Sequence, residues 1–103
     1  MPEIRLTESA VDDLYEIWNY IAIEQCSPQA ADGILDAINE KVLLALSHPG
    51  VGQQVDHLRP DTRRLVVKRR FLVFYQNEED GLLVLRVLHG ARLISKSDFE
   101  RLR

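Results

Sequence analysis

The sheet of this protein can be predicted best from residues 70–89, RFLVFYQNEEDGLLVLRVLH. The two ends of this stretch, 70–76 and 82–89, are rich in aromatic and β-branched residues, which favour strands. The polar segment 77–81 between them ends in glycine, the residue that tight turns often need where φ is positive. The stretch therefore predicts two antiparallel strands. The preceding TRRLVV, residues 62–67, predicts a third strand, and the three together predict an antiparallel meander.

The N-terminal half has the periodicity of one strand and two helices. PEIRLT, residues 2–7, alternates apolar and charged side chains, which is typical of a short strand. Apolar residues then recur every three or four positions over about 8–25 and again over about 28–47, which indicates two amphipathic helices. Only two or three residues separate these helices, and such a short connection favours an antiparallel helical hairpin. We expect residues 49–61, with two glycines and two prolines, to form a loop.

The predicted element order is β-α-α-β-β-β, followed by a possible short helix over 95–102. We expect one α+β domain over residues 1–103, in which the helical hairpin packs on a small antiparallel sheet. The residues expected in the core between these layers are Trp18, Phe71, Val73 and Tyr75.

Both faces of the predicted sheet are apolar. On simple alternation, the side chains expected beneath the helices are Phe71, Val73, Leu83, Leu85 and Val87, and those expected on the second face are Leu72, Phe74, Val84, Arg86 and Leu88. Large exposed apolar patches are rare on soluble monomers, so the second face needs a cover. A segment of a partner protein is the natural candidate for that cover.

Charge divides the chain into two halves. Residues 1–58 contain two basic and ten acidic residues, whereas residues 59–103 contain eleven basic and six acidic residues. The acidic half suits a solvated helical surface, and the basic half suits contact with a nucleic acid or an acidic protein. The net charge of −3 argues mildly against a dedicated nucleic-acid binder.

The sequence favours a cytoplasmic protein without a metal or cofactor. Cys26 has no second cysteine with which to form a disulfide, which fits a reducing compartment. The N-terminus lacks the pattern of a signal peptide, and no apolar run is long enough to span a membrane. The spacing of His48 and His57 to each other and to Cys26 matches no metal site.

Several phrases, in this order, resemble the RelE/ParE toxin superfamily and its ParE branch most closely. They are LTESAVDDLYEIWNYIA (6–22), SPQAADGILDAI (27–38), HPGVGQQVDHLRPDTRRLVV (48–67) and RFLVFYQNEEDGLLVLRVLHGAR (70–92). The most telling is RVLHGAR, residues 86–92, which follows an FYQ-type strand and an acidic turn. Each phrase alone is weak, and their shared order and spacing carry the resemblance.

The resemblance implies the toxin of a type II toxin–antitoxin system. ParE-like toxins act on DNA gyrase and block replication, whereas RelE-like toxins cut messenger RNA on the ribosome. The partner of a ParE-like toxin is usually a ParD-like antitoxin, whose ribbon-helix-helix part binds operator DNA and whose tail folds over the toxin. The complex represses its own operon, so the toxin meets operator DNA only through the antitoxin.

The resemblance also bears on whether the chain could be a nuclease. Arg70, His89 and Arg92 match positions that carry catalytic residues in some RelE-like nucleases, but Gly90 stands where some of them carry a tyrosine, and the lysines are few. We therefore favour a gyrase inhibitor without chemistry of its own, and expect His89 simply to hydrogen-bond a backbone carbonyl. A ribosome-dependent ribonuclease and a degenerate, antitoxin-binding regulator remain as alternatives.

Two surfaces are predicted to meet a partner. One is a groove beside helix 8–25, where Tyr15 and Trp18 would form an anchor pocket. The other is the second sheet face with the basic residues near it, and the side chains expected there are Arg70, Leu72, Phe74, Arg86, Leu88 and Arg92.

Overall fold

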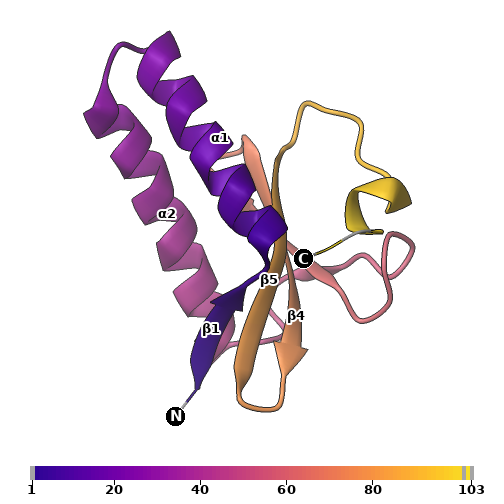
Figure 1. The fold of residues 1–103 in the computed structure, drawn as a ribbon. Helices are drawn as coiled ribbons and strands as arrows, with labels where there is room; N and C mark the ends of the chain where they lie inside the picture. Colours follow the sequence, from indigo (N-terminus) through magenta and orange to yellow (C-terminus); the bar gives the residue numbers. More distant parts are fainter. Residues whose placement is uncertain (1, 101, 103) are drawn as a thin grey trace.

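A computed structural model describes residues 2–100 and 102. Its elements, in chain order, are β1 (Glu3–Leu6), α1 (Glu8–Glu24), α2 (Pro28–Ser47), β2 (Gln53–Gln54), β3 (Arg63–Val67), β4 (Phe71–Glu78), β5 (Gly81–His89) and the 3-10 turn η1 (Lys96–Phe99) (Figure 1). The predicted α+β class and element order are confirmed. The segment expected to be all loop also contains β2, which pairs with β3. The possible helix over 95–102 is only the short turn η1, and residue 101 lies outside the described residues.

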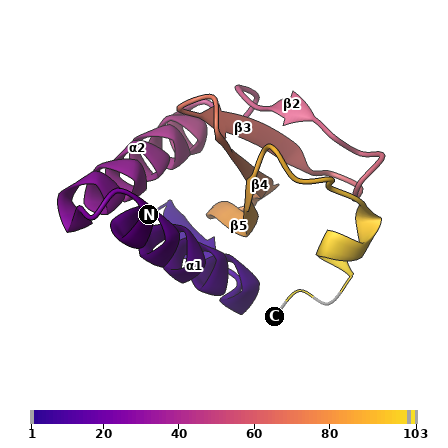
Figure 2. The same cartoon turned by 90° about the horizontal axis from the view of Figure 1, so that it is seen from above.

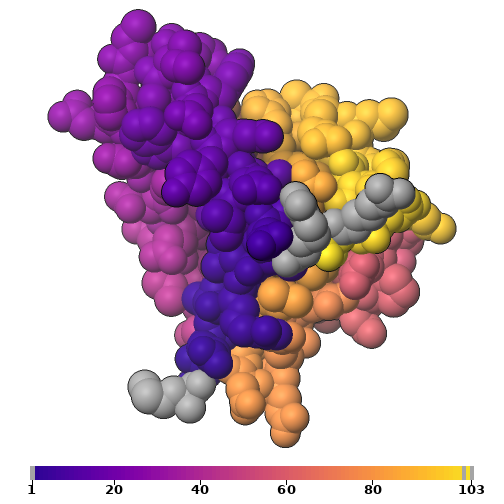
Figure 3. Space-filling view, in the orientation of Figure 1, coloured from indigo at the N-terminus to yellow at the C-terminus, as the bar shows by residue number. Residues whose placement is uncertain are grey.

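The two helices begin where hydroxyl side chains cap them. The Thr7 side chain accepts a hydrogen bond from the backbone nitrogen of Ala10 at 3.0 Å, and the Ser27 side chain accepts one from that of Ala30 at 3.1 Å. Each cap satisfies a backbone donor that has no partner within its helix. Because only three residues connect the helices, they lie side by side and antiparallel, and their connected ends project at the top of the molecule (Figures 1 and 3). Neither helix is long and apolar enough to cross a membrane, as far as the described residues go.

The sheet has the strand order β1-β5-β4-β3-β2. The predicted meander β3–β4–β5 is antiparallel, whereas β1 pairs with β5 in parallel, which makes the sheet mixed. Parallel neighbours need a crossover connection, and the helical hairpin belongs to that connection here. Gly81, at φ 149°, lets β1 approach, because a Cβ atom at this position would lie 1.9 Å from the carbonyl oxygen of Glu3.

A β-bulge in β5 reverses the expected alternation of its side chains. Phe74 pairs with Arg86, but the next residue, Tyr75, pairs with Val84, so that Leu85 is extra. The extra residue changes the phase of the strand. Leu82 and Val84 consequently join the core beneath the helices, and Leu83 and Leu85 do not. The placement of Val84 on the second face, and of Leu83 and Leu85 beneath the helices, was therefore wrong.

The sheet separates two apolar clusters (Figure 2). Beneath the helices, Phe71, Val73 and Tyr75 are buried as predicted, and Trp18 packs at the margin, half-buried. On the second face, the buried members are Val55, Phe74, Leu88 and Phe99, with Leu58, Leu72, Ile94 and Leu102 packed against them.

The expectation of an uncovered second face was wrong. Phe74 and Leu88 are only 1% and 3% exposed, because the loop around Val55 and the C-terminal Phe99 cover them. Sequence alternation showed that this face needs a cover, and the chain itself supplies one.

Candidate functional site

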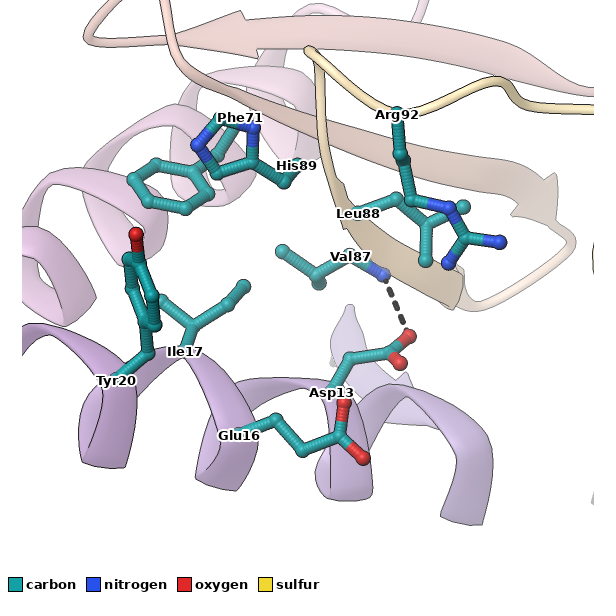
Figure 4. A pocket seen from close by; sticks show the side chains of 9 residues that line it. All are labelled: Asp13, Glu16, Ile17, Tyr20, Phe71, Val87, Leu88, His89 and Arg92. Carbon is teal, nitrogen blue, oxygen red and sulfur yellow. Dashed lines mark hydrogen bonds between the residues drawn. The ribbon is translucent and has the colours of Figure 1, made fainter.

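A pocket of about 380 Å³ lies between α1 and the end of β5 (Figure 4). It is lined by Asp13, Glu16, Ile17 and Tyr20 from α1 and by Phe71, Val87, Leu88, His89 and Arg92. The four helical residues share one face, because positions three and four apart are neighbours on a helix. Tyr20 rises toward Phe71 and His89, and Arg92 lies on the other side of the pocket, above Asp13 (Figure 4).

Asp13 is a buried carboxylate whose oxygens bind β5. Nε and Nη2 of Arg86 donate to its two oxygens at 2.7 and 2.8 Å, and the backbone nitrogen of Val87 donates at 3.0 Å. The hydrogen bond to Asp13 raises the pKa of Arg86 above its usual value, although burial opposes this. Charge-assisted bidentate pairs of this kind are strong and fix orientation. The pair therefore holds α1 against β5, and Asp13 itself lines the pocket.

Arg86 and Arg92 also hold the C-terminal turn. Nη1 of Arg86 donates to the carbonyl oxygen of Asp98 at 2.7 Å, and Nη2 of Arg92 donates to Oδ1 of Asp98 at 2.6 Å. The other oxygen of Asp98 accepts from the backbone nitrogen of Ser95 at 2.9 Å. Arg86 was expected to offer its charge to a partner, but its guanidinium is instead engaged within the chain.

His89 and Arg70 surround Phe71 at the same end of the sheet. Nδ1 of His89 accepts a hydrogen bond from the backbone nitrogen of Ala91 at 3.1 Å, and its ring meets that of Phe71 edge-on at 5.3 Å between centroids. The Arg70 guanidinium lies 5.3 Å from the Phe71 ring centroid. A hydrogen bond with Glu24 raises the pKa of Tyr20, while the nearby charge of Arg70 lowers it. The structure thus places Arg70, His89 and Arg92 at one end of the sheet.

The pocket is poorly equipped to bind a phosphodiester. Cleavage of RNA by this chemistry needs an acid, a base and a cation directed at the phosphate. Here Arg92 is paired with Asp98, Nδ1 of His89 is occupied, Asp13 is paired with Arg86, and Glu16 adds negative charge. The electrostatics of the pocket therefore oppose entry of an RNA backbone.

A second hollow lies on the outer side of the helical hairpin. Its volume is about 540 Å³, and its lining is mostly apolar: Val11, Leu14, Tyr15, Trp18, Asn19 and Leu35. Nε1 of Trp18 donates to Asp32 of α2 at 2.8 Å, and the Tyr15 side chain is 69% exposed. The structure thus brings together Tyr15 and Trp18, the two residues predicted to form an anchor pocket. We call this hollow the hairpin groove.

Among residues 2–100 and 102, no three His, Cys, Asp or Glu side chains lie close enough together to hold a metal ion.

A model of the ParE toxin of the type II toxin–antitoxin system parDE matches residues 4–94. The chain belongs to the ParE toxin family. A solved structure, "Chromosomal ParDE TA system from P. aeruginosa", shares its fold with a TM-score of 0.72 and 22% identity, over 86% of this chain and 96% of that one. A search among curated proteins found no match.

The ParE match covers β1 from its second residue, the other four strands, both helices and every residue that lines the two hollows. It ends at residue 94, just before η1, so that Asp98 and Phe99 lie beyond it. The cover of the second sheet face therefore comes partly from residues outside the part matched to the ParE family.

The sequence interpretation missed the roles of Asp13, Glu16, Tyr20 and Asp98. One signal was present: Asp13 interrupts the apolar stripe of α1 between Ala10 and Ile17, at a position that faces the core. A charged residue at a core position needs a partner of opposite charge. The sequence did not show that this partner is Arg86, 73 positions away.

Proposed function

We propose that this ParE-family chain acts in the cytoplasm by binding DNA gyrase and blocking replication, without catalysing a reaction itself. The supporting observation is the state of the pocket at the end of β5. Its one arginine, Arg92, bonds to Asp98 at 2.6 Å, and the pocket is also lined by Glu16 and by Asp13, which is paired with Arg86. A site in this state suits protein recognition better than cleavage of a polyanion.

A ribosome-dependent ribonuclease is the second candidate. In its favour, Glu16, Tyr20, His89 and Arg92 converge on one pocket, a set of side chains able to exchange protons and bind a phosphate. Induction of the toxin alone, with separate readouts of the DNA-damage response and of messenger RNA cleavage, tests the two. We expect a strong damage response with intact transcripts. Cleaved transcripts without a damage response would favour the ribonuclease.

Replacing His89 with alanine should leave toxicity nearly intact. The reason is that Nδ1 of His89 already accepts a backbone hydrogen bond and that Arg92, the arginine that lines the pocket, is paired with Asp98. Loss of a general acid or base typically slows an enzyme by about 10²–10⁴-fold. Growth curves after induction measure the effect, with circular dichroism as the control for folding. Complete loss of toxicity in a folded variant would refute the proposal that the toxin catalyses no reaction.

A ParD-like antitoxin is the proposed partner, and the hairpin groove is its proposed main contact. The groove is apolar and exposed, whereas Phe74 and Leu88 are buried and Arg86 is engaged. Aromatic side chains are the usual energetic anchors of interfaces. Through the DNA-binding part of this antitoxin, the complex would repress its own operon.

Replacing Tyr15 with alanine should weaken the antitoxin complex by about 2 kcal/mol or more, the size of a hot-spot effect. Ile23→Ala is the matched control, because Ile23 is also on α1 and 77% exposed but does not line the groove. Calorimetry on both variants gives the dissociation constants. If Tyr15→Ala binds as tightly as the Ile23→Ala control, the hairpin groove is not the main contact.

A further inference from the structure

The turn between β3 and β4 has an unusual sequence for its shape. The backbone nitrogen of Arg70 donates to the carbonyl oxygen of Val67 at 3.1 Å, and the two central residues, Lys68 and Arg69, have φ values of 54° and 56°. The loop between the paired residues Val67 and Phe71 has three residues, and its first two are the central residues of a β-turn over 67–70. β-Turns with positive φ at both central positions are usually built from Asn, Asp and Gly, most often as Asn-Gly or Asp-Gly. Here the chain has two long cationic side chains in that conformation.

This conformation is strained, and the surrounding structure holds it in place. A left-handed backbone is unfavourable for residues other than glycine and persists where neighbouring structure dictates it. β3 and β4 are paired up to Val67 and Phe71 on either side of the turn. The backbone nitrogen of Gly90 also donates to the carbonyl oxygen of Arg70 at 2.7 Å. Asn-Gly would adopt this turn with less strain, so the backbone conformation does not explain why Lys68 and Arg69 occupy it. We therefore infer that their side chains have a role.

The turn presents positive charge that the chain does not neutralise. Lys68 and Arg69 are exposed, and Arg70 follows with its guanidinium over the Phe71 ring. The three ion pairs found within the described residues use other arginines. The turn thus carries three consecutive cations, on a protein whose net charge is −3.

We propose that this turn, residues 68–70, binds the phosphates of duplex DNA without sequence preference. Lys and Arg side chains make most such contacts. An acidic protein surface fits less well, because residues 68–70 carry no apolar side chain of the kind that anchors protein interfaces, and the nearest exposed large apolar side chain is a single valine on β3, Val66.

The DNA contact rests on the proposed function and deepens it. Three phosphate contacts give weak binding, and the remaining net negative charge of the protein opposes it. The contact becomes effective when the toxin is already docked on gyrase, an enzyme that holds duplex DNA. The turn would then touch that DNA beside the protein contact.

Fluorescence anisotropy with a labelled duplex of about 30 base pairs tests the proposal at several salt concentrations. For three phosphate contacts, the logarithm of the association constant should fall with the logarithm of salt concentration at a slope of about −2.7. Lys68→Asn/Arg69→Gly removes two cations and supplies the relaxed Asn-Gly turn. This variant should reduce the slope by about 2 and weaken binding at low salt about tenfold. Its melting temperature should rise by about 4 °C or more, because strain is relieved.

Lys96→Gln/Gln29→Glu is the matched control, because it shifts the net charge by the same amount at exposed positions on η1 and α2. The proposal is overturned if the control weakens DNA binding as much as the turn variant does, or if the turn variant binds as wild type. It is also overturned if wild type prefers poly-L-glutamate to the duplex, since an acidic protein would then be the ligand. The binding assay contains no gyrase, so a wild-type toxin that fails to inhibit gyrase would refute the proposed function and leave the DNA contact standing.

Discussion

Replacing Asp13 with alanine should lower the free energy of unfolding by about 3–5 kcal/mol, the usual effect of removing one partner from a buried ion pair. The side chains of Arg86 and Asp13 are only 20% and 7% exposed, and the carboxylate also binds the backbone of β5. Without Asp13, the guanidinium of Arg86 loses its main partner at a partly buried position. Urea denaturation followed by circular dichroism measures the change.

Glu78→Ala is the control for this prediction, because it breaks the ion pair between Arg5 and Glu78, whose side chains are 59% and 32% exposed. Pairs at such exposed positions are worth about 1 kcal/mol or less. Equal losses in the two variants would contradict the structural role of Asp13. The same reasoning predicts that Arg86→Glu unfolds the protein, so that Arg86 cannot report on antitoxin binding.

Replacing Phe99 with alanine should cost about 3–5 kcal/mol of stability, the usual effect of truncating a buried aromatic residue. Phe99 is 2% exposed, and its ring meets that of Phe74 edge-on at 5.0 Å between centroids. Its loss would leave a cavity over the second face of the sheet and loosen the cover. We also expect the variant to aggregate more readily than wild type, because apolar surface on β4 and β5 becomes accessible.

Leu93→Ala provides the comparison, because Leu93 is 92% exposed on the segment that leads into η1. Substitutions at such positions usually change stability by about 0.5 kcal/mol or less. Thermal melts and light scattering on both variants distinguish the cases. If Phe99→Ala is as stable and as soluble as Leu93→Ala, then the C-terminal turn does not cover the sheet in solution.

Much of the fold could be predicted because its elements have regular local patterns. The periodic apolar residues predicted α1 and α2, and the runs of aromatic and β-branched residues predicted β3, β4 and β5. The bulge at Leu85 could not be predicted, because β5 is apolar along most of its length. An extra residue in such a strand does not change the pattern of apolar and polar residues in the sequence. β2 was missed because it consists of only two glutamines, which show no alternation of apolar and polar residues and have no marked preference for strands.

The candidate site was predictable where it depends on one helix. Tyr15 and Trp18 are three residues apart, so their proximity on one face of α1 follows from helical spacing, whereas the contribution of Leu35 from α2 does not. The pocket at the end of β5 combines residues from α1, β4 and β5 with the segment after β5, and Asp13 meets Arg86 across 73 positions. The contact between Phe74 and Phe99 also joins residues that are distant in the sequence. It could therefore not be predicted, and a partner protein was expected to cover the second face instead.

We propose that the chain inhibits gyrase without cutting RNA. The most direct test is a supercoiling assay with purified gyrase and increasing toxin, beside a ribosome-programmed messenger RNA cleavage assay with the same preparation. We expect loss of supercoiling or accumulation of cleaved plasmid, reversal by the antitoxin, and intact messenger RNA. Unaffected gyrase together with messenger RNA cut on the ribosome would contradict it.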